Sequence, residues 1–431
     1  MSHDSSKNKF FRQSGWMIFC TVVSGFAFYG VHPFAKKIPE SEYGILGLIL
    51  AVLNCMSIPS LGLQMVFAQQ TAAAVDDRHR RELSGTAHGV LLGTFLIWLA
   101  AAVLVVVFRE PILAHWKISN SAALWLMLLV GLLSMWLPVF NGILQGQQNF
   151  LWVGWSSMLN STGRLAAVAV VVLVFHGYAA GMTGGILLGV LVSTVIGITF
   201  SREVWRGRGA PVPWKSWLAR VVPLTFGFGA FQFMFSADPL FVKAWFDETT
   251  TAYYIAAGTL GRALVAFTGP VVNVMFPKVV RSVALAEKTS VVGLTLIITA
   301  VLAGLGALGL SLVAPWLLVK VYKDTYVAAV PLLPWFAAGM APLALANVLL
   351  NDLMARSRFK VVPWLIVIVA GYATALNFHH ASFVAVIQVI GVFNLVFLAV
   401  VGLFAWIDAK TGAAPAPPGE NFLNRHRAVS P

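Results

Sequence analysis

The sequence has little charge and few acidic residues. Of its 431 residues only 10% are charged, with 16 Asp and Glu against 29 Lys and Arg, and 59% are apolar. A soluble domain of this size could not bury such long apolar runs. This composition argues against a soluble enzyme or binding domain and predicts an all-α, polytopic membrane protein.

Cysteine is almost absent, and recognisable catalytic motifs are missing. Cys20 and Cys55 both lie in apolar runs, where a free cysteine is usually a small buried side chain, so we expect neither a disulfide framework nor a metal site. The glycine-rich stretch 176–185 lacks the Gly-Lys-Ser/Thr ending of a phosphate-binding loop. No nucleophile and base occur in a plausible arrangement. We therefore expect no cofactor and no enzymatic activity.

Apolar windows of about twenty residues predict twelve transmembrane helices. Six fall in each half of the chain. The predicted spans are 14–34, 43–66, 89–108, 122–143, 153–175 and 182–200, then 218–241, 252–275, 290–313, 327–350, 361–377 and 383–406.

Positive charge is distributed unevenly across these spans. When Arg220, at the start of the seventh span, is counted with the loop before it, twenty of the 29 Lys and Arg residues fall on the side of the N-terminus. Seven fall on the other side, and two lie deep inside spans. Because positive loops are retained in the cytoplasm, this predicts cytoplasmic N- and C-termini. The net charge of +13 is then mostly an orientation signal, and we expect no nucleic-acid partner.

A loop rich in Arg, Gly and Pro divides the chain into two six-helix halves. The predicted organisation is an N-terminal lobe at 1–205, an inter-lobe cytoplasmic loop at 206–216, and a C-terminal lobe at 217–410. The Pro/Ala-rich segment 411–431 is predicted to be a disordered cytoplasmic tail.

The two halves also resemble each other weakly. Pro59 in the second span and Pro270 in the eighth align at an offset of 211, and both are expected to kink their helices. Near two other span ends, Asn141–Gln145 (NGILQ) resembles Asn347–Asn351 (NVLLN). An even number of helices in each half predicts parallel repeats, a common plan among transporters.

Two arginines lie near the predicted middle of the membrane, Arg164 in the fifth span and Arg262 in the eighth. A charge facing lipid at this depth costs at least about 2.5 kcal/mol, so both are expected to face a hydrated cavity between the lobes. Asn160 shares a helix face with Arg164, and Asn273 shares one with Arg262. These four residues are the predicted substrate-binding residues.

Asp238, in the outer part of the seventh span, is the acidic residue available to pair with these arginines. An ion pair with Arg262, an ion pair with nearby Lys243 and a coupling-ion site are all open interpretations of Asp238. One acid cannot neutralise two arginines, so at least one guanidinium is left for an anionic ligand such as phosphate.

The charged stretch DDRHRR at 76–81 could be mistaken for a functional motif. Major facilitator transporters carry an acid–arginine–glycine pattern in the corresponding loop, but the glycine is absent here. We interpret the stretch as a solvated cytoplasmic loop.

The chain as a whole resembles the MOP flippase superfamily, and within it the bacterial Wzx-type flippases of lipid-linked oligosaccharides. The resemblance rests on ESEYGILGLILAV (40–52), GILQGQQNF (142–150), SADPLFVKAWF (236–246) and TLGRALVAFTGPVVNVMFPKV (259–279), in that order. It implies two six-helix lobes around a central cationic cavity and a polyprenyl-pyrophosphate-linked sugar as substrate.

This resemblance also implies partners and leaves alternatives open. The expected partners are the lipid-linked oligosaccharide and the lipid bilayer, with a polysaccharide polymerase and glycosyltransferases as further candidates. A multidrug or organic-ion exporter of the same superfamily is the second reading and a major facilitator transporter the third. A structural envelope protein gains little support, because polar residues at mid-membrane would then have no use.

Overall fold

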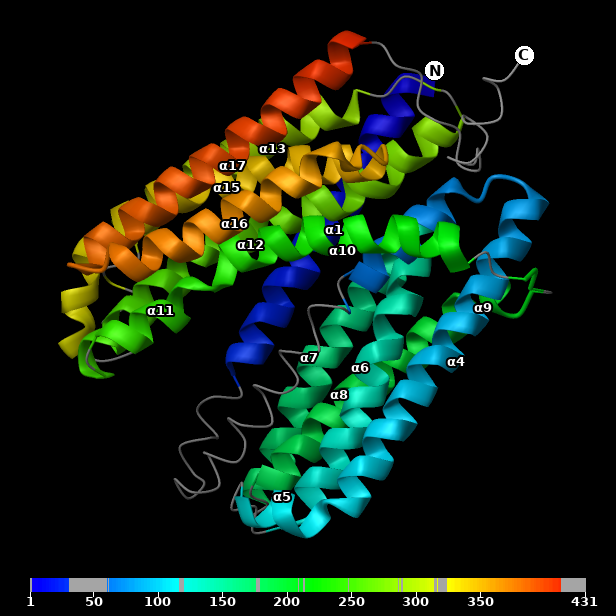
Figure 1. Cartoon of the computed structure of the whole chain (residues 1–431), viewed down its shortest axis with the longest axis horizontal. Coiled ribbons are helices and arrows are strands. Elements are labelled where there is room, and N and C mark those ends of the chain that lie inside the picture. Colours follow the sequence, from blue (N-terminus) through cyan, green and yellow to red (C-terminus); the bar gives the residue numbers. More distant parts are fainter. Residues whose placement is uncertain are drawn as a thin grey trace, which may run out of the picture. The chain divides into compact units, whose positions relative to one another are not determined.

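The computed structural model is helical throughout the residues that it describes (Figure 1). These residues are 2–30, 60, 62–115, 120–175, 179–207, 209–211, 214–246, 248–285, 287, 290–313, 316 and 324–411. Most of the predicted second span, with Pro59 and Cys55, and the predicted tail 412–431 lie outside them. The chain divides into two compact units, residues 1–221 and 222–431.

The first unit is a bundle of long helices around α7. Its helices are α1 (Ser2–Tyr29), α4 (Asp77–Val107), α5 (Arg109–His115), α6 (Ala122–Gly146), α7 (Phe150–Leu173), α8 (Ala179–Phe200), α9 (Arg202–Trp205) and the start of α10 (Trp214–Ser236). Helix α7 packs on α8 and α1, and α8 also packs on α6. Val130, Val168, Ile186 and Val190 form part of the buried core between α6, α7 and α8.

The second unit is built around α15. It contains the rest of α10, α11 (Asp238–Trp245), α12 (Glu248–Ala284), α13 (Val291–Leu312), the 3-10 helix η1 (Asp324–Leu332), α15 (Leu333–Ala355), the 3-10 helix η2 (Phe359–Val361), α16 (Val362–Phe378) and α17 (Phe383–Thr411). Helix α15 contacts α12, α13 and α17. Gly339 of α15 and Gly391 of α17 let the two backbones approach closely.

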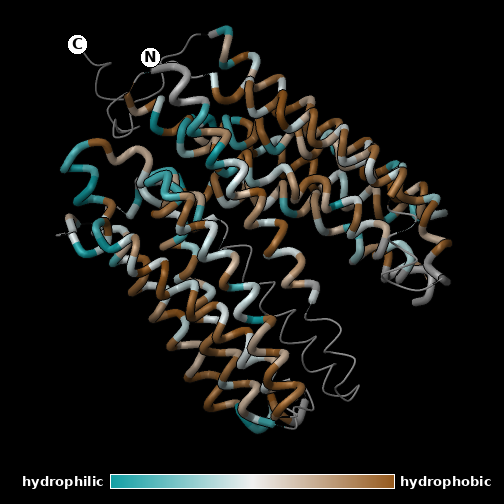
Figure 2. The backbone as a smooth tube through the Cα atoms, turned by 180° about the vertical axis from the view of Figure 1, so that it is seen from behind, coloured by the Kyte–Doolittle hydropathy of each residue, from teal (hydrophilic) through white to brown (hydrophobic). Residues whose placement is uncertain are grey.

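Ten helices among the described residues are long and apolar enough to cross a membrane, which confirms ten of the predicted spans. The predicted first span lies largely within α1, which begins at Ser2 and so includes the polar N-terminal residues. Leu96, Ile97 and Val107 of α4 are more than half exposed, as are Ile297 and Leu308 of α13. A bilayer would cover such side chains, and Figure 2 shows hydrophobic residues along the helices with hydrophilic ones gathered near their ends.

The prediction of one continuous seventh span, 218–241, is wrong in detail. Helix α10 ends at Ser236 and α11 begins at Asp238, with Ala237 between them. Pro239 stands in the first turn of α11 and has no N–H to continue the hydrogen bonding of α10. The break lies at Asp238, the acidic residue that the sequence singles out.

Helices α6 and α15 end in the same type of turn. Gln148 (φ 59°) and Ser357 (φ 57°) follow these helices in the left-handed conformation. In both places the next residue donates from its N–H to a carbonyl five residues earlier, Asn149 to Leu144 at 2.9 Å and Arg358 to Leu353 at 2.8 Å. The two turns are Schellman caps.

These matching caps give a second possible alignment of the two halves, and the repeat itself stays a prediction. Gln148 corresponds to Ser357, an offset of 209, whereas the match of Asn141–Gln145 to Asn347–Asn351 has an offset of 206. The sequences of two apolar helices can be aligned in several registers, whereas the left-handed residue of a cap marks one particular position. The proposed equivalence of Pro59 and Pro270 involves a residue outside the described ranges.

The stretch 76–81 opens α4 with local charge pairs. Asp76 caps the helix by accepting a hydrogen bond from the His79 N–H at 2.8 Å. That bond, followed by one from the His79 ring, lowers the pKa of Asp76 below its usual value. Arg78 pairs with Glu82 at 3.2 Å, also on the surface. The side chains are solvent-exposed as predicted, but residues 77–81 form the first turns of α4 and not a loop.

The predicted inter-lobe loop is anchored on α4 of the first unit. Ser84 donates to the Gly207 carbonyl at 2.7 Å, and the Ala210 N–H donates to the Arg81 carbonyl at 3.0 Å. Gly85 lies directly against Ala210, and any side chain at Gly85 would collide with this backbone.

Candidate functional site

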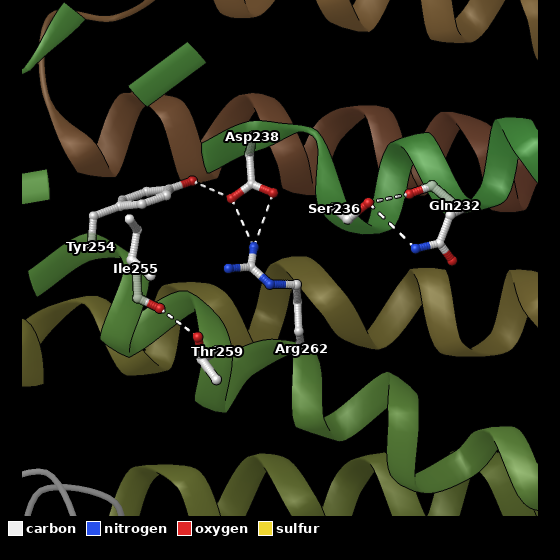
Figure 3. A network of polar contacts seen from close by, with 7 residues as sticks. All are labelled: Gln232, Ser236, Asp238, Tyr254, Ile255, Thr259 and Arg262. Atoms are coloured by element: carbon white, nitrogen blue, oxygen red, sulfur yellow. Dashed lines mark hydrogen bonds and ion pairs between the residues drawn. The ribbon is translucent and has the colours of Figure 1, made fainter. Parts of the chain in front are cut away.

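The polar site of the second unit is centred on Asp238, at the start of α11 (Figure 3). Its carboxylate is fully buried and accepts a hydrogen bond from the Tyr254 hydroxyl at 2.8 Å. Nη1 of Arg262 donates to both carboxylate oxygens, each at 3.0 Å. Of the open interpretations of Asp238, the structure therefore contains the ion pair with Arg262. The side chain of Lys243 lies outside the described residues.

The spacing of residues on α12 explains why two of them reach one carboxylate. Tyr254, Gly258 and Arg262 follow one another at intervals of four, which places them on one helix face. Gly258 has no side chain to separate the tyrosine from the arginine. The Tyr254 ring is fully buried and packs on Phe336 at 5.1 Å between ring centroids and on Phe383 at 5.3 Å.

Asp238 occupies only one of the three nitrogens of Arg262. Nε and Nη2 donate to no described residue, and unlike Nε of Arg164 neither is a buried, unsatisfied atom. The Arg262 side chain is 13% exposed and that of Asp238 is 0% exposed. In a guanidinium, Nε–H and one N–H of Nη2 point the same way and form a parallel pair of donors. This Nε/Nη2 edge is opposite to the nitrogen that holds Asp238.

The other polar side chains in Figure 3 bond within their own helices. Thr259 donates to the Ile255 carbonyl at 2.8 Å, and Ser236 donates to the Gln232 carbonyl at 2.8 Å. They do not join the Asp238–Arg262–Tyr254 network.

Arg164 lies on α7 in the first unit and has no acidic partner among the described residues. Its guanidinium carbon is 5.5 Å from the centre of the Phe28 ring on α1, a cation–π contact. Its Nε is buried without a hydrogen-bond partner. Ser24 and Ser157 form a hydrogen bond of 3.2 Å between the same two helices. The sequence argument that one arginine is left without an acid therefore applies to Arg164.

The remaining predicted site residues lie on the same helices as the arginines. Asn160 and Arg164 both meet Gly189 of α8, where α7 and α8 are in close contact. Asn273 is partly buried on α12, eleven residues after Arg262, which is roughly 16 Å along the helix axis. Pro270 is buried inside α12 and leaves one helical hydrogen bond unmade.

Tyr254 and Gly258 are site residues that the sequence argument missed. The available signal was the interval of four residues from Tyr254 through Gly258 to Arg262, because it puts a hydroxyl, a gap and a guanidinium on one face.

Comparison with solved structures defines the class of fold. An outward-facing multidrug resistance MATE family transporter of the MOP superfamily is 12% identical, with a TM-score of 0.74 over 94% of this chain and 96% of that one. A variant of the Vibrio cholerae MATE transporter VcmN is 13% identical, with a TM-score of 0.74 over 95% and 98%. The chain thus has the MATE-like fold of MOP-superfamily transporters.

Comparison with family models gives a more specific assignment than the fold. The model described as "Polysaccharide biosynthesis protein" matches residues 11–283, and the chain belongs to this family. A comparison with curated proteins finds no match. Family and fold together make the chain a multi-pass membrane transporter of the MOP superfamily.

Proposed function

We propose that this transporter is a flippase for polyprenyl-pyrophosphate-linked oligosaccharide. It moves this lipid from the cytoplasmic to the periplasmic leaflet by alternating access, for synthesis of a surface polysaccharide such as O-antigen, capsule or exopolysaccharide. Glycosyltransferases supply the substrate, and a polysaccharide polymerase uses the product. The description of the family as polysaccharide biosynthesis proteins supports this choice of substrate.

The observation that carries the proposal is the unused Nε/Nη2 edge of Arg262. A phosphate group presents two oxygens at a spacing that matches two parallel N–H donors. Asp238 fixes the guanidinium from the other side through Nη1, so the arginine is held in place before a ligand binds. Arg164 supplies a second guanidinium without an acidic partner among the described residues.

An exporter of cationic drugs is the second candidate, because the structural neighbours include multidrug transporters. A cation would need an open carboxylate near the middle of the membrane. Asp238 is fully buried and already accepts three hydrogen bonds from Arg262 and Tyr254. The site thus favours an anionic ligand over a cationic one.

Deletion of the gene in its native host tests the proposed function. We expect the deletion strain to lose its surface polymer and to accumulate the lipid-linked oligosaccharide in the cytoplasmic leaflet, and we expect the intact gene to reverse both effects. Resistance to cationic dyes should not change. A strain that keeps its surface polymer but becomes sensitive to such dyes would instead identify an exporter.

The proposal includes an inner-membrane location with both termini in the cytoplasm, as the Lys and Arg distribution predicts. Reporter tags after Gly209 and at the C-terminus should both give cytoplasmic signals. A tag at Ala180, near the start of α8, should give a periplasmic one. A periplasmic signal at Gly209 would refute this topology.

A further inference from the structure

Gly258 lies directly beneath the guanidinium of Arg262, one helical turn before it on α12. A Cβ atom at Gly258 would stand 2.9 Å from Nη2 and 3.3 Å from Cζ of Arg262. It would also stand 3.0 Å from Cζ of Phe336 on α15. Contacts this short force a neighbour to move, and the guanidinium is one of the two neighbours.

Neither neighbour is free to move without cost. Arg262 is held at Nη1 by Asp238, and Asp238 is held in turn by Tyr254. Phe336 is fully buried and packs against the Tyr254 ring. A side chain at position 258 therefore either turns the guanidinium about its bond to Asp238 or pushes α12 and α15 apart.

We infer that Gly258 is a positioning residue for anion binding at Arg262. The missing side chain leaves room beside α12 for Nη2 and Cζ of the guanidinium, with Nη1 on Asp238 and the Nε/Nη2 edge left open. The ligand that this edge takes is an oxyanion offering two oxygens at once, as a pyrophosphate head group does. This inference rests on the proposed function, because it names what orients the proposed substrate contact.

Gly261 provides a matched control on the same helix. A Cβ there would meet Phe336 at Cβ (2.6 Å), Cγ (3.1 Å) and Cδ1 (3.3 Å), and no atom of Arg262 is among its three nearest neighbours. Gly258→Ala and Gly261→Ala thus both crowd Phe336, but only Gly258→Ala crowds Arg262. Both changes favour the helix locally, because alanine is a better helix former than glycine.

The test is a double-mutant cycle with Arg262→Lys, which keeps the positive charge but has no Nη2. In the Arg262 background we expect Gly258→Ala to reduce the flipping rate at least about tenfold, since small displacements of a positioning group have effects of this size. In the Arg262→Lys background the same change should reduce flipping less than about twofold. Gly261→Ala should act by the same factor in both backgrounds.

Purified protein provides a second readout that does not depend on transport. The melting temperature of each variant should rise with added polyprenyl pyrophosphate, and Gly258→Ala should lessen that rise more than Gly261→Ala does. The inference is overturned if Gly258→Ala flips and binds as the unchanged protein does, or if its effect is equal in both Arg262 backgrounds. Normal flipping by the Arg262→Ala/Asp238→Asn variant would instead contradict the proposed contact between Arg262 and the substrate.

Discussion

Arg262→Ala is expected to abolish most flipping and also to destabilise the second unit. The substitution leaves the Asp238 carboxylate fully buried, and among the described residues the Tyr254 hydroxyl is its remaining side-chain partner. Breaking a buried ion pair by removing one member typically costs about 3–5 kcal/mol, because the other charge stays behind. We expect a lower melting temperature in detergent and a reduced amount of protein in the membrane.

Two further variants separate substrate binding from stability. Arg262→Ala/Asp238→Asn removes both charges, so the protein level should recover while flipping stays low. Arg262→Lys keeps a cation beside Asp238 and should be stable, with partial flipping because the parallel donors are gone. Loss of a charge-assisted contact worth about 1.5–3 kcal/mol corresponds to a loss of roughly ten- to hundredfold. Surface polymer, measured alongside membrane protein level, gives both quantities.

Arg164→Ala is expected to reduce flipping by a similar factor without loss of protein. No acid among the described residues pairs with Arg164, so its removal leaves no uncompensated charge. Its buried Nε, which lacks a hydrogen-bond partner, is also removed. Flipping should fall because a guanidinium that we propose to contact the anionic substrate is missing. The measurement is again surface polymer relative to membrane protein level.

Phe28→Leu serves as the control for Arg164. It removes the ring beneath the guanidinium but keeps an apolar side chain, so it should weaken flipping much less than Arg164→Ala. If Arg164→Ala instead disappears from the membrane while Phe28→Leu is unaffected, Arg164 is a structural residue of the α1–α7 contact.

The two arginines show how much of the candidate site can be predicted from the sequence. Residue type and depth in an apolar run are enough to mark a costly charge, so Arg164 and Arg262 could be selected from the sequence alone. The count of one acid for two arginines also predicts that one stays unpaired. The sequence leaves Arg262, Lys243 and a coupling ion open as the partner of Asp238, because the choice depends on α11 bringing Asp238 against α12.

Apolar runs predict spans well and their interruptions poorly. Ten described helices match predicted spans, because length and hydropathy suffice to find them. The break at Ala237 falls inside the apolar window predicted as the seventh span, although Pro239 marks the start of α11. The two Schellman caps could not be predicted from the sequence either. Left-handed caps usually carry glycine, but here they carry Gln148 and Ser357.

Helix periodicity predicts a shared face but not a shared site. Asn273 and Arg262 lie on similar faces of α12, yet they are separated by about three turns. Tyr254 and Gly258 lie within roughly two turns of Arg262 and contribute directly to its geometry. Distance along the helix therefore has to be weighed together with the face.

The most direct test of the account is flipping by purified protein in liposomes. The liposomes contain polyprenyl-pyrophosphate-linked oligosaccharide, and its movement across the bilayer is measured by its reaction with a sugar-modifying enzyme added outside. A matched lipid with a single neutral head group is the control. The unchanged protein should flip the pyrophosphate lipid and not the neutral one, and Arg262→Ala/Asp238→Asn should flip neither while reconstituting in equal amount. Equal flipping of the pyrophosphate lipid by the double variant and the unchanged protein would contradict the assignment of Arg262 as the phosphate contact.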